Sequence, residues 1–287
     1  MEVDNSMKKW SSITLCYNEE MWIPYQLKQL NDSIIDEIMI VDGSHGAHKD
    51  IDDKMNKKVK YNEPHRFGII NDNLPSFDDT REIIKNFNSN KIKFLGVEDI
   101  HYSIVDEQSI KNFCVDSVSF KYIFMADTDE FYMDLNKYLM DFEKIFENGY
   151  DLITVKTLYE FYFDFDKYII STNIPVAIKK GIKFVATRLF DTNKEYIYDG
   201  ICYHYSYIKP YERIRQKMNG YGWKGQRWFN NIVNNYGKVP DNELSNYNSV
   251  NPNSIHFCIK NKIFEKNKIE HPRVVKPLIE KWKWNER

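Results

Sequence analysis

Residues 111–131 read KNFCVDSVSFKYIFMADTDEF, and this stretch predicts a helix that leads directly into a buried strand. The helix is expected over 106–120, where apolar side chains recur at helical spacing. Residues 122–126 form a continuous apolar run, which is typical of a strand covered on both faces. The run stops at the acidic segment 127–130, so carboxylates are expected at the carboxyl end of this strand.

The same alternation of strand and helix precedes this segment. Strands are predicted over 13–17, 38–41 and 92–97, and a helix follows the first of them. Repeated strand–helix units favour a mainly parallel sheet with helices on both faces. Ligands bind at the carboxyl ends of the strands in such sheets. Asp42, which ends the second strand, and segment 127–130 are therefore expected to meet in one cleft.

The second half of the chain is less regular. Residues 158–166 alternate between aromatic and acidic or polar side chains, which predicts a half-buried strand with an acidic outer face. Beyond residue 205 the sequence is basic and favours helix. We therefore expect a main domain over 1–205 and a helical or irregular C-terminal extension over 206–287 that packs on it.

Composition excludes several classes of protein. The 287 residues carry 40 basic and 42 acidic side chains, a balance that gives no general reason to bind nucleic acid. Only eight of the basic residues are Arg, so each Arg is of interest as a bidentate ligand for phosphate. The four cysteines are widely spaced and no apolar run approaches the roughly 20 residues of a transmembrane helix. A cytoplasmic protein without a transmembrane segment is expected.

The acidic segment is the strongest candidate for chemistry. In an extended chain, residues two apart point to the same side, so Asp127 and Asp129 are expected to present their carboxylates together. Such carboxylates repel each other unless a cation lies between them, and a hard divalent ion is the usual one. Mg²⁺ or Mn²⁺ held there would bridge the phosphates of a nucleotide. A solvated acidic turn is the alternative.

Three motifs together resemble the nucleotide-sugar glycosyltransferases of the GT-A fold that are related to glycosyltransferase family 2. They are ITLCYNEE (13–20), IMIVDGSH (38–45) and the segment 111–131. The resemblance implies a GT-A-type, Rossmann-like sheet. It also implies that Asp42 contacts the uracil or ribose of the donor, that Asp127 lies near the ribose and that Asp129 binds the metal. Where the family usually has an Arg-Asn pair, this chain has Lys111-Asn112, so a diphosphate contact from Lys111 would be a point charge.

A second block, DGICYHYSYIKPYERIRQK (199–217), is similar to a later motif of several such enzymes. By that resemblance His204 completes the metal site, and the basic residues after it, Lys209 and Lys217 among them, approach the diphosphate. The alternative for His204 is a half-buried strand histidine without a ligand.

These observations predict a metal-dependent glycosyltransferase that uses Mn²⁺ or Mg²⁺. It would move a sugar from a nucleotide-diphosphate donor, with a UDP-sugar favoured, to a hydroxyl group of a glycan, lipid or protein. An inverting enzyme also needs a carboxylate to accept the acceptor proton. Asp199, near His204 in the sequence, is the first candidate. Glu160, Asp164 and Asp166 on the acidic strand face are the others.

Two other functions are compatible with the sequence. A nucleotidyltransferase also uses paired carboxylates and a divalent metal, but it commonly has a Gly-rich basic loop after the first strand, where this chain reads YNEE. A protein of the same fold that binds a nucleotide or sugar without catalysis is the second alternative.

Overall fold

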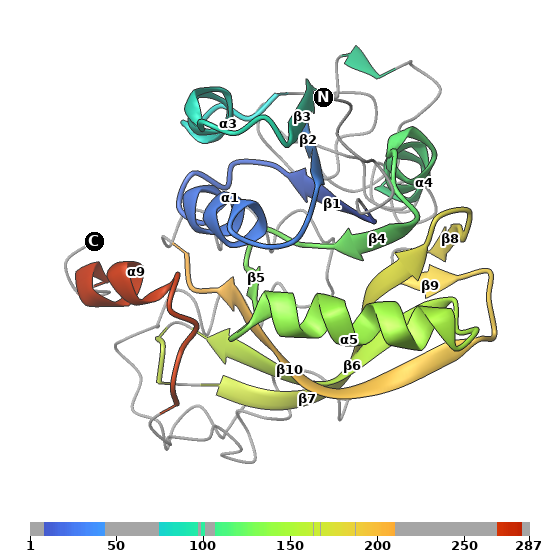
Figure 1. Cartoon of the computed structure of the whole chain (residues 1–287). Coiled ribbons are helices and arrows are strands. Elements are labelled where there is room, and N and C mark those ends of the chain that lie inside the picture. Colours follow the sequence, from blue (N-terminus) through green and yellow to red (C-terminus); the bar gives the residue numbers. More distant parts are fainter. Residues whose placement is uncertain are drawn as a thin grey trace, which may run out of the picture.

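The computed structural model describes residues 9–43, 75–96, 99–100, 107–162, 164–166, 168–186, 188–209 and 269–282. An eight-stranded sheet in the order β3-β2-β1-β4-β7-β6-β10-β5 forms its centre, and a two-stranded hairpin, β8-β9, lies beside it (Figure 1). The strands are β1 Trp10–Cys16, β2 Glu37–Asp42, β3 Ile92–Gly96, β4 Tyr122–Met125, β5 Glu130–Phe131, β6 Leu152–Tyr162, β7 Tyr168–Lys179, β8 Phe184–Ala186, β9 Leu189–Phe190 and β10 Glu195–Tyr207. The helices are α1 Ile23–Asn31, α3 Thr80–Asn86, α4 Glu107–Ser117, α5 Leu135–Glu147 and α9 Lys276–Lys281.

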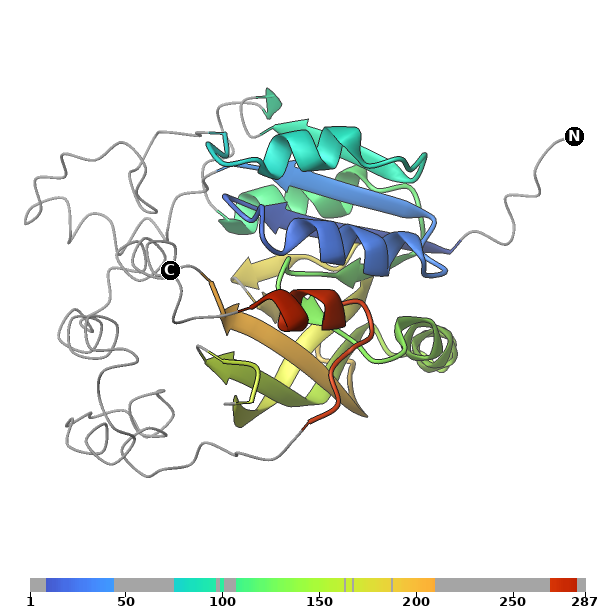
Figure 2. The ribbon, with the colours of Figure 1, turned by 90° about the vertical axis from the view of Figure 1, so that its left-hand side faces the viewer.

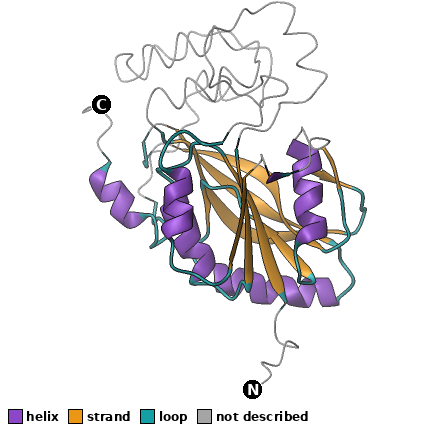
Figure 3. Ribbon diagram, turned by 90° about the horizontal axis from the view of Figure 1, so that it is seen from above, coloured by secondary structure: helices purple, strands orange, loops and turns teal. Residues whose placement is uncertain are grey.

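The sheet has a parallel half and a mixed half. Strands β3, β2, β1 and β4 pair in parallel, as the alternation of strands and helices predicts. Strand β7 then pairs antiparallel with both β4 and β6, and β5 pairs antiparallel with β10. The predicted α/β architecture is confirmed, and the antiparallel β7 is among the elements that the sequence pattern does not indicate. Figure 3 shows helices on both sides of the fan of strands.

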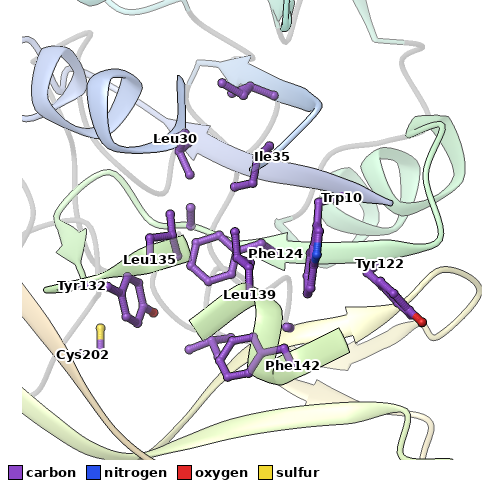
Figure 4. Close-up of a cluster of buried hydrophobic side chains, with 14 of the residues drawn as sticks. Trp10, Leu30, Ile35, Tyr122, Phe124, Tyr132, Leu135, Leu139, Phe142 and Cys202 are labelled. Carbon is purple, nitrogen blue, oxygen red and sulfur yellow. The ribbon is translucent and has the colours of Figure 1, made fainter. Parts of the chain in front are cut away.

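The core divides along the two faces of the sheet because strand residues alternate. In β2, Ile38 and Ile40 belong to one buried cluster, whereas Met39 and Val41 belong to the other. Helices α1, α3 and α5 cover the first face, where Leu30, Phe124 and Phe142 lie among the buried side chains (Figure 4). Helix α4 covers the second face. The parallel strands are thus buried on both sides, which is what their continuous apolar runs require.

A third, aromatic cluster connects the C-terminal segment 269–282 to the sheet. Trp22 and Tyr205 stack at its centre with ring centroids 5.0 Å apart. From the C-terminal segment, the Trp282 ring approaches Phe165 at 6.3 Å and His271 hydrogen-bonds with the Tyr205 hydroxyl at 2.8 Å. Helix α9 therefore lies close to the end of β10 (Figure 2). The rest of the predicted extension lies outside the described residues, and its boundary at 205/206 stays a prediction.

Strand β10 contains a bulge that sets its register. From Glu195 to Tyr198 each β10 residue pairs with the β6 residue 43 positions earlier, but Ile201 pairs with Thr157. One extra residue of β10 therefore lies between Tyr198 and Ile201. Gly200 occupies this bulge, and a β-carbon there would lie 2.8 Å from the Tyr138 ring. A residue without a side chain is needed because the α5 aromatic packs so closely.

The loop after β1 is tied to the segment before α3. Helix α1 begins after Trp22, so Asn18 lies in the loop between β1 and α1. Asn18 has a positive φ of 54°, and its side-chain oxygen accepts a hydrogen bond from the Phe77 amide at 2.8 Å. It holds segment 75–78 over the end of β1. None of the helices in the described residues is long and apolar enough to span a membrane.

Candidate functional site

The acidic segment 127–130 follows β4 as predicted, but it forms a turn. The Glu130 amide donates to the Asp127 carbonyl oxygen at 3.2 Å, and the side-chain amide of Gln26 donates to the same carbonyl at 2.9 Å. The expected extended chain, which was the reason to place the Asp127 and Asp129 carboxylates together, does not exist here. The two carboxylates have different partners: Arg188 for Asp127, and His204 and Lys209 for Asp129.

Asp129 and His204 are brought together as the motif resemblance implies. The distance from His204 Nε2 to Asp129 Oδ1 is 3.4 Å, and the Asp129 side chain is only 6% exposed. The main chain fixes this pair, because the Tyr205 amide donates to the Asp129 carbonyl oxygen at 2.8 Å. The placement of His204 beside Asp129 therefore follows from the pairing of β10 with the turn after β4.

Two glutamates flank His204 across the sheet. His204 is paired with Glu130 of β5 on one side and with Glu160 of β6 on the other. Directly paired residues share a face of a sheet, so the three side chains lie in one row. Burial alone would lower the pKa of His204, but Asp129, Glu130 and Glu160 together raise it above the ordinary 6.5. The imidazole thus lies in a strongly negative environment.

Lys209 is a buried cation on the other side of Asp129. Its ammonium nitrogen lies 3.2 Å from Asp129 Oδ2 and forms a second ion pair with Glu19. The lysine is held in place by its neighbour Ile208, whose carbonyl oxygen accepts a hydrogen bond from the Trp22 indole at 3.0 Å. Lys209 therefore ties the loop after β1 to the candidate metal carboxylate.

Arg188 is the site residue that the sequence interpretation misses. It lies between β8 and β9, and its guanidinium pairs with Asp127 and, at 2.5 Å, with Glu130. The scarcity of Arg in the composition was the only signal for it, since no motif surrounds residue 188. The hairpin that carries it is absent from the predicted elements.

Arg188 lowers the pKa of both its carboxylate partners, but the net pKa shifts of the two are opposite. Around Asp127, burial opposes ionisation, but Arg188 and then Lys111 outweigh it and lower the pKa to about 2. Glu130 is fully buried, and this burial raises its pKa in spite of Arg188. Its Oε2 atom is buried with no hydrogen-bond partner among the described residues. The charged form of Glu130 is therefore stabilised by its ion pair with the Arg188 guanidinium.

Lys111 lies on α4, in the same shallow pocket as Asp127 and Arg188. Its ammonium group pairs with Glu107 at 2.6 Å and lies over the Phe184 ring at 5.5 Å. The neighbouring Asn112 binds the backbone of Phe184 through its side-chain amide, at 2.8 and 3.0 Å. The Lys111-Asn112 pair thus places one cation in the pocket and anchors the β8-β9 hairpin.

Asp42 ends β2 as predicted, but its side chain is fully buried. The carboxylate pairs with Arg81 of α3 and accepts hydrogen bonds from the amide, at 3.1 Å, and from the hydroxyl of Ser76. In this structure the Asp42 side chain contacts protein groups on segment 75–81 and has no exposed surface for a nucleoside.

Asp199, the first candidate for the catalytic base, is at the surface. Its side chain is 87% exposed, and its carboxylate lies 3.2 Å from the Lys156 ammonium group. The strand predicted over 158–166 ends at Tyr162, so Asp164 and Asp166 lie in the turn after β6 and not on a strand face. Glu160 lies on the strand, and its Oε1 is 3.9 Å from His204 Nδ1. The structure thus brings Glu160, not Asp199, to His204. Lys217 lies outside the described residues.

The donor atoms of Asp129 and His204 fit a divalent cation. Two ligands at right angles around an ion with bonds of about 2.1 Å lie roughly 3 Å apart. The 3.4 Å between Oδ1 and Nε2 is close to this value. In the described part of the chain no group of three His, Cys, Asp or Glu side chains is arranged to hold a metal.

Comparison with known proteins finds similarity at the level of structure. No family model matches the chain, and no curated protein sequence matches it. Among solved structures, S. aureus TarS 1-349 in complex with UDP-GlcNAc matches at 16% identity and a TM-score of 0.35, covering 53% of this chain and 35% of that chain. Glucosyl-3-phosphoglycerate synthase from Mycobacterium tuberculosis, in complex with Mn²⁺, UDP and glucosyl-3-phosphoglycerate, matches at 13% and 0.33, covering 55% and 45%.

A third structure belongs to a different class of enzyme. The 4-diphosphocytidyl-2C-methyl-D-erythritol synthase from Anaerococcus prevotii matches at 9% identity and a TM-score of 0.37, covering 74% of this chain and 96% of that chain. The matched part of this chain spans less than half the length of the TarS and glucosyl-3-phosphoglycerate synthase chains. All three TM-scores are below 0.5. The sheet itself shows the predicted α/β fold, and the GT-A type stays what the sequence motifs resemble.

Proposed function

We propose that the protein is a metal-dependent glycosyltransferase that moves a sugar from a nucleotide-diphosphate donor, with a UDP-sugar favoured, to a hydroxyl acceptor. The observation that carries this proposal is the pair formed by Asp129 and His204, 3.4 Å apart at the end of the parallel strands. Carboxylate and imidazole side by side are suitable ligands for Mn²⁺. Ligands of α/β sheets bind at this edge.

The arrangement of cations supports a diphosphate leaving group. Lys111 lies in the pocket beside Asp127, and Lys209 lies beside Asp129. Sugar transfer leaves negative charge on the diphosphate, and fixed cations stabilise that charge in the transition state. A bound Mn²⁺ or Mg²⁺ would supply further positive charge there. Lys111 is paired with Glu107, and Lys209 is paired with Glu19 and Asp129, so each lysine would exchange carboxylate partners for phosphate when the donor binds.

Glu160 takes the place of Asp199 as the candidate base. A general base has to reach the acceptor proton near the metal and the donor. Glu160 lies in the same row as His204, while Asp199 points to solvent with its charge paired to Lys156. We therefore assign the base role to Glu160 in an inverting reaction.

The experiment is a panel of nucleotide sugars with and without Mn²⁺, read as release of free nucleoside diphosphate. The expected result is metal-dependent release with a UDP-sugar. It should be lost in Asp129→Asn at a temperature where circular dichroism shows that the variant is still folded. Asp199→Asn serves as the matched control, since it removes an exposed carboxylate from the same sheet. Release that is unchanged by EDTA, or calorimetry that finds no nucleotide binding, would contradict the proposal.

A further inference from the structure

The guanidinium of Arg188 lies between the carboxylates of Asp127 and Glu130. The proposed reaction places no metal ion on either of them. One of its terminal nitrogens pairs with both Asp127 and Glu130, and the other donates to the Pro175 carbonyl oxygen at 3.3 Å. The Arg188 side chain is 30% exposed, so it is packed into the site rather than extended into solvent.

We propose that Arg188 is a positioning residue that prevents Asp127 and Glu130 from binding a divalent cation and thereby directs the cation to Asp129. The guanidinium carries a permanent charge and occupies the place between the two carboxylates where an ion would sit. From the proposed function, this inference takes only the assumption that a divalent ion binds at the site.

Glu130 gives the physical reason. Its side chain is fully buried, and a buried carboxylate charge is stable only beside an opposite charge. One of its oxygens pairs with Arg188, and the other has no hydrogen-bond partner among the described residues. Without the guanidinium, Glu130 and the partly exposed Asp127 would be neighbouring carboxylates that lack this counter-charge. Such a pair attracts a divalent cation.

The fold holds Arg188 in this position from two sides. Asn112 and Gln108 of α4 fix Phe184 of the same hairpin through hydrogen bonds of 2.8 to 3.0 Å. On the other side, the Pro175 carbonyl of β7 receives the second terminal nitrogen. The residue is therefore held by neighbouring elements, and a small cation does not displace it easily.

The test measures Mn²⁺ binding in the absence of any nucleotide, by calorimetry and by the electron paramagnetic resonance signal of free Mn²⁺. Arg188→Gln should bind Mn²⁺ about tenfold or more tightly than the wild type, because two carboxylates lose their counter-charge. Arg188→Lys keeps a cation, and Arg188→Gln/Glu130→Gln removes one carboxylate as well. Both should stay within about threefold of the wild type.

Several outcomes would overturn the inference. One is an Arg188→Gln variant whose nucleotide-free Mn²⁺ affinity is unchanged, and another is a double variant that keeps the gain. Loss of nucleotide affinity with no change in metal affinity would instead make Arg188 a direct diphosphate ligand. If Arg188→Gln unfolds, rescue of its thermal midpoint by Mn²⁺ supports the inference and lack of rescue overturns it. Because metal alone is the probe, failure of every sugar donor would not affect this result.

Discussion

Glu160 lies opposite His204 across the parallel pairing of β6 and β10, and its Oε1 is 3.9 Å from the imidazole Nδ1. The other ring nitrogen faces Asp129 at 3.4 Å. Nδ1 is buried and makes no hydrogen bond in the described part of the structure. The His204 imidazole thus lies between Asp129, the candidate metal ligand, and Glu160, the candidate base. Substituting Asp129 and Glu160 one at a time therefore tests the two roles separately.

Glu160→Gln should reduce kcat by about 100-fold with little change in the Michaelis constant for the donor, because a general base acts in the transition state. Asp199→Asn should keep activity within about twofold of the wild type, since exposed ion pairs contribute little. Steady-state kinetics with the donor found in the panel checks both variants. If Glu160 only orients His204, the same substitution would weaken Mn²⁺ binding and leave the pH profile of kcat unchanged.

His204→Ala should weaken Mn²⁺ affinity in the presence of nucleotide and shift the preference toward Mg²⁺, because imidazole suits Mn²⁺ better than Mg²⁺. In the wild type, Mn²⁺ affinity should decline as the pH falls through a value above 6.5. Neighbouring carboxylates raise the pKa of His204, and only the neutral ring binds metal. Calorimetry with each metal across pH 6 to 8 measures this. A purely structural histidine would lower the thermal midpoint on substitution and leave the metal preference as it was.

Asp42→Asn should lower the free energy of unfolding by about 3 kcal/mol or more, because it leaves Arg81 without its buried partner. If Asp42 contacts the nucleoside, the Michaelis constant for the donor should also rise more than kcat falls. Urea unfolding and donor kinetics measure the two effects. Glu82→Gln, on the exposed side of the same helix α3, is the control and should change stability by less than about 0.5 kcal/mol. A drop in kcat at constant Michaelis constant would place Asp42 away from the nucleoside.

His271 should make the protein less stable as the pH falls from about 6.5 to 4. Burial lowers the pKa of His271 to about 4, below its unfolded value of 6.5, so the unfolded chain binds more protons in this window. The loss at pH 4.5 should be about 1 to 3 kcal/mol relative to pH 7. Urea unfolding at both values checks it, with His271→Phe as the variant that should lose less. Equal losses in the two proteins would mean that the docking of segment 269–282 does not depend on a neutral imidazole.

The parallel half of the fold was predictable because its signals are local. The apolar runs of β1, β2 and β4 and the helical spacing of α1, α4 and α5 each lie within about a dozen residues. Residues 42 and 127–130 were expected at strand ends for the same reason. The proximity of Asp129 and His204 came from motif resemblance, since nothing in the spacing of residues 75 positions apart indicates a contact.

The rest of the site depends on pairings between distant segments. Glu160 meets His204 only through the register of β6 and β10, and the acidic strand face alone did not distinguish it from Asp164 or Asp166. Arg188 reaches Asp127 from a hairpin with no apolar periodicity, 61 residues along the chain. Asp199 was preferred because it is near His204 in sequence, but five residues of extended strand span roughly 16 Å. Sequence proximity is therefore a poor guide to contact within a strand.

The single extra residue in β10 determines which aromatic ring enters the site. Before the bulge the offset between β10 and β6 is 43 residues, as in Tyr198 opposite Val155, and after it the offset is 44, as in His204 opposite Glu160. With the earlier offset, Tyr203 would stand opposite Glu160, and His204 would turn to the opposite face of the sheet. The imidazole beside Asp129 would thus be replaced by a phenol without any change in the site residues themselves. The number of residues between Tyr198 and Ile201 therefore determines the chemistry of the site together with the identity of residue 204.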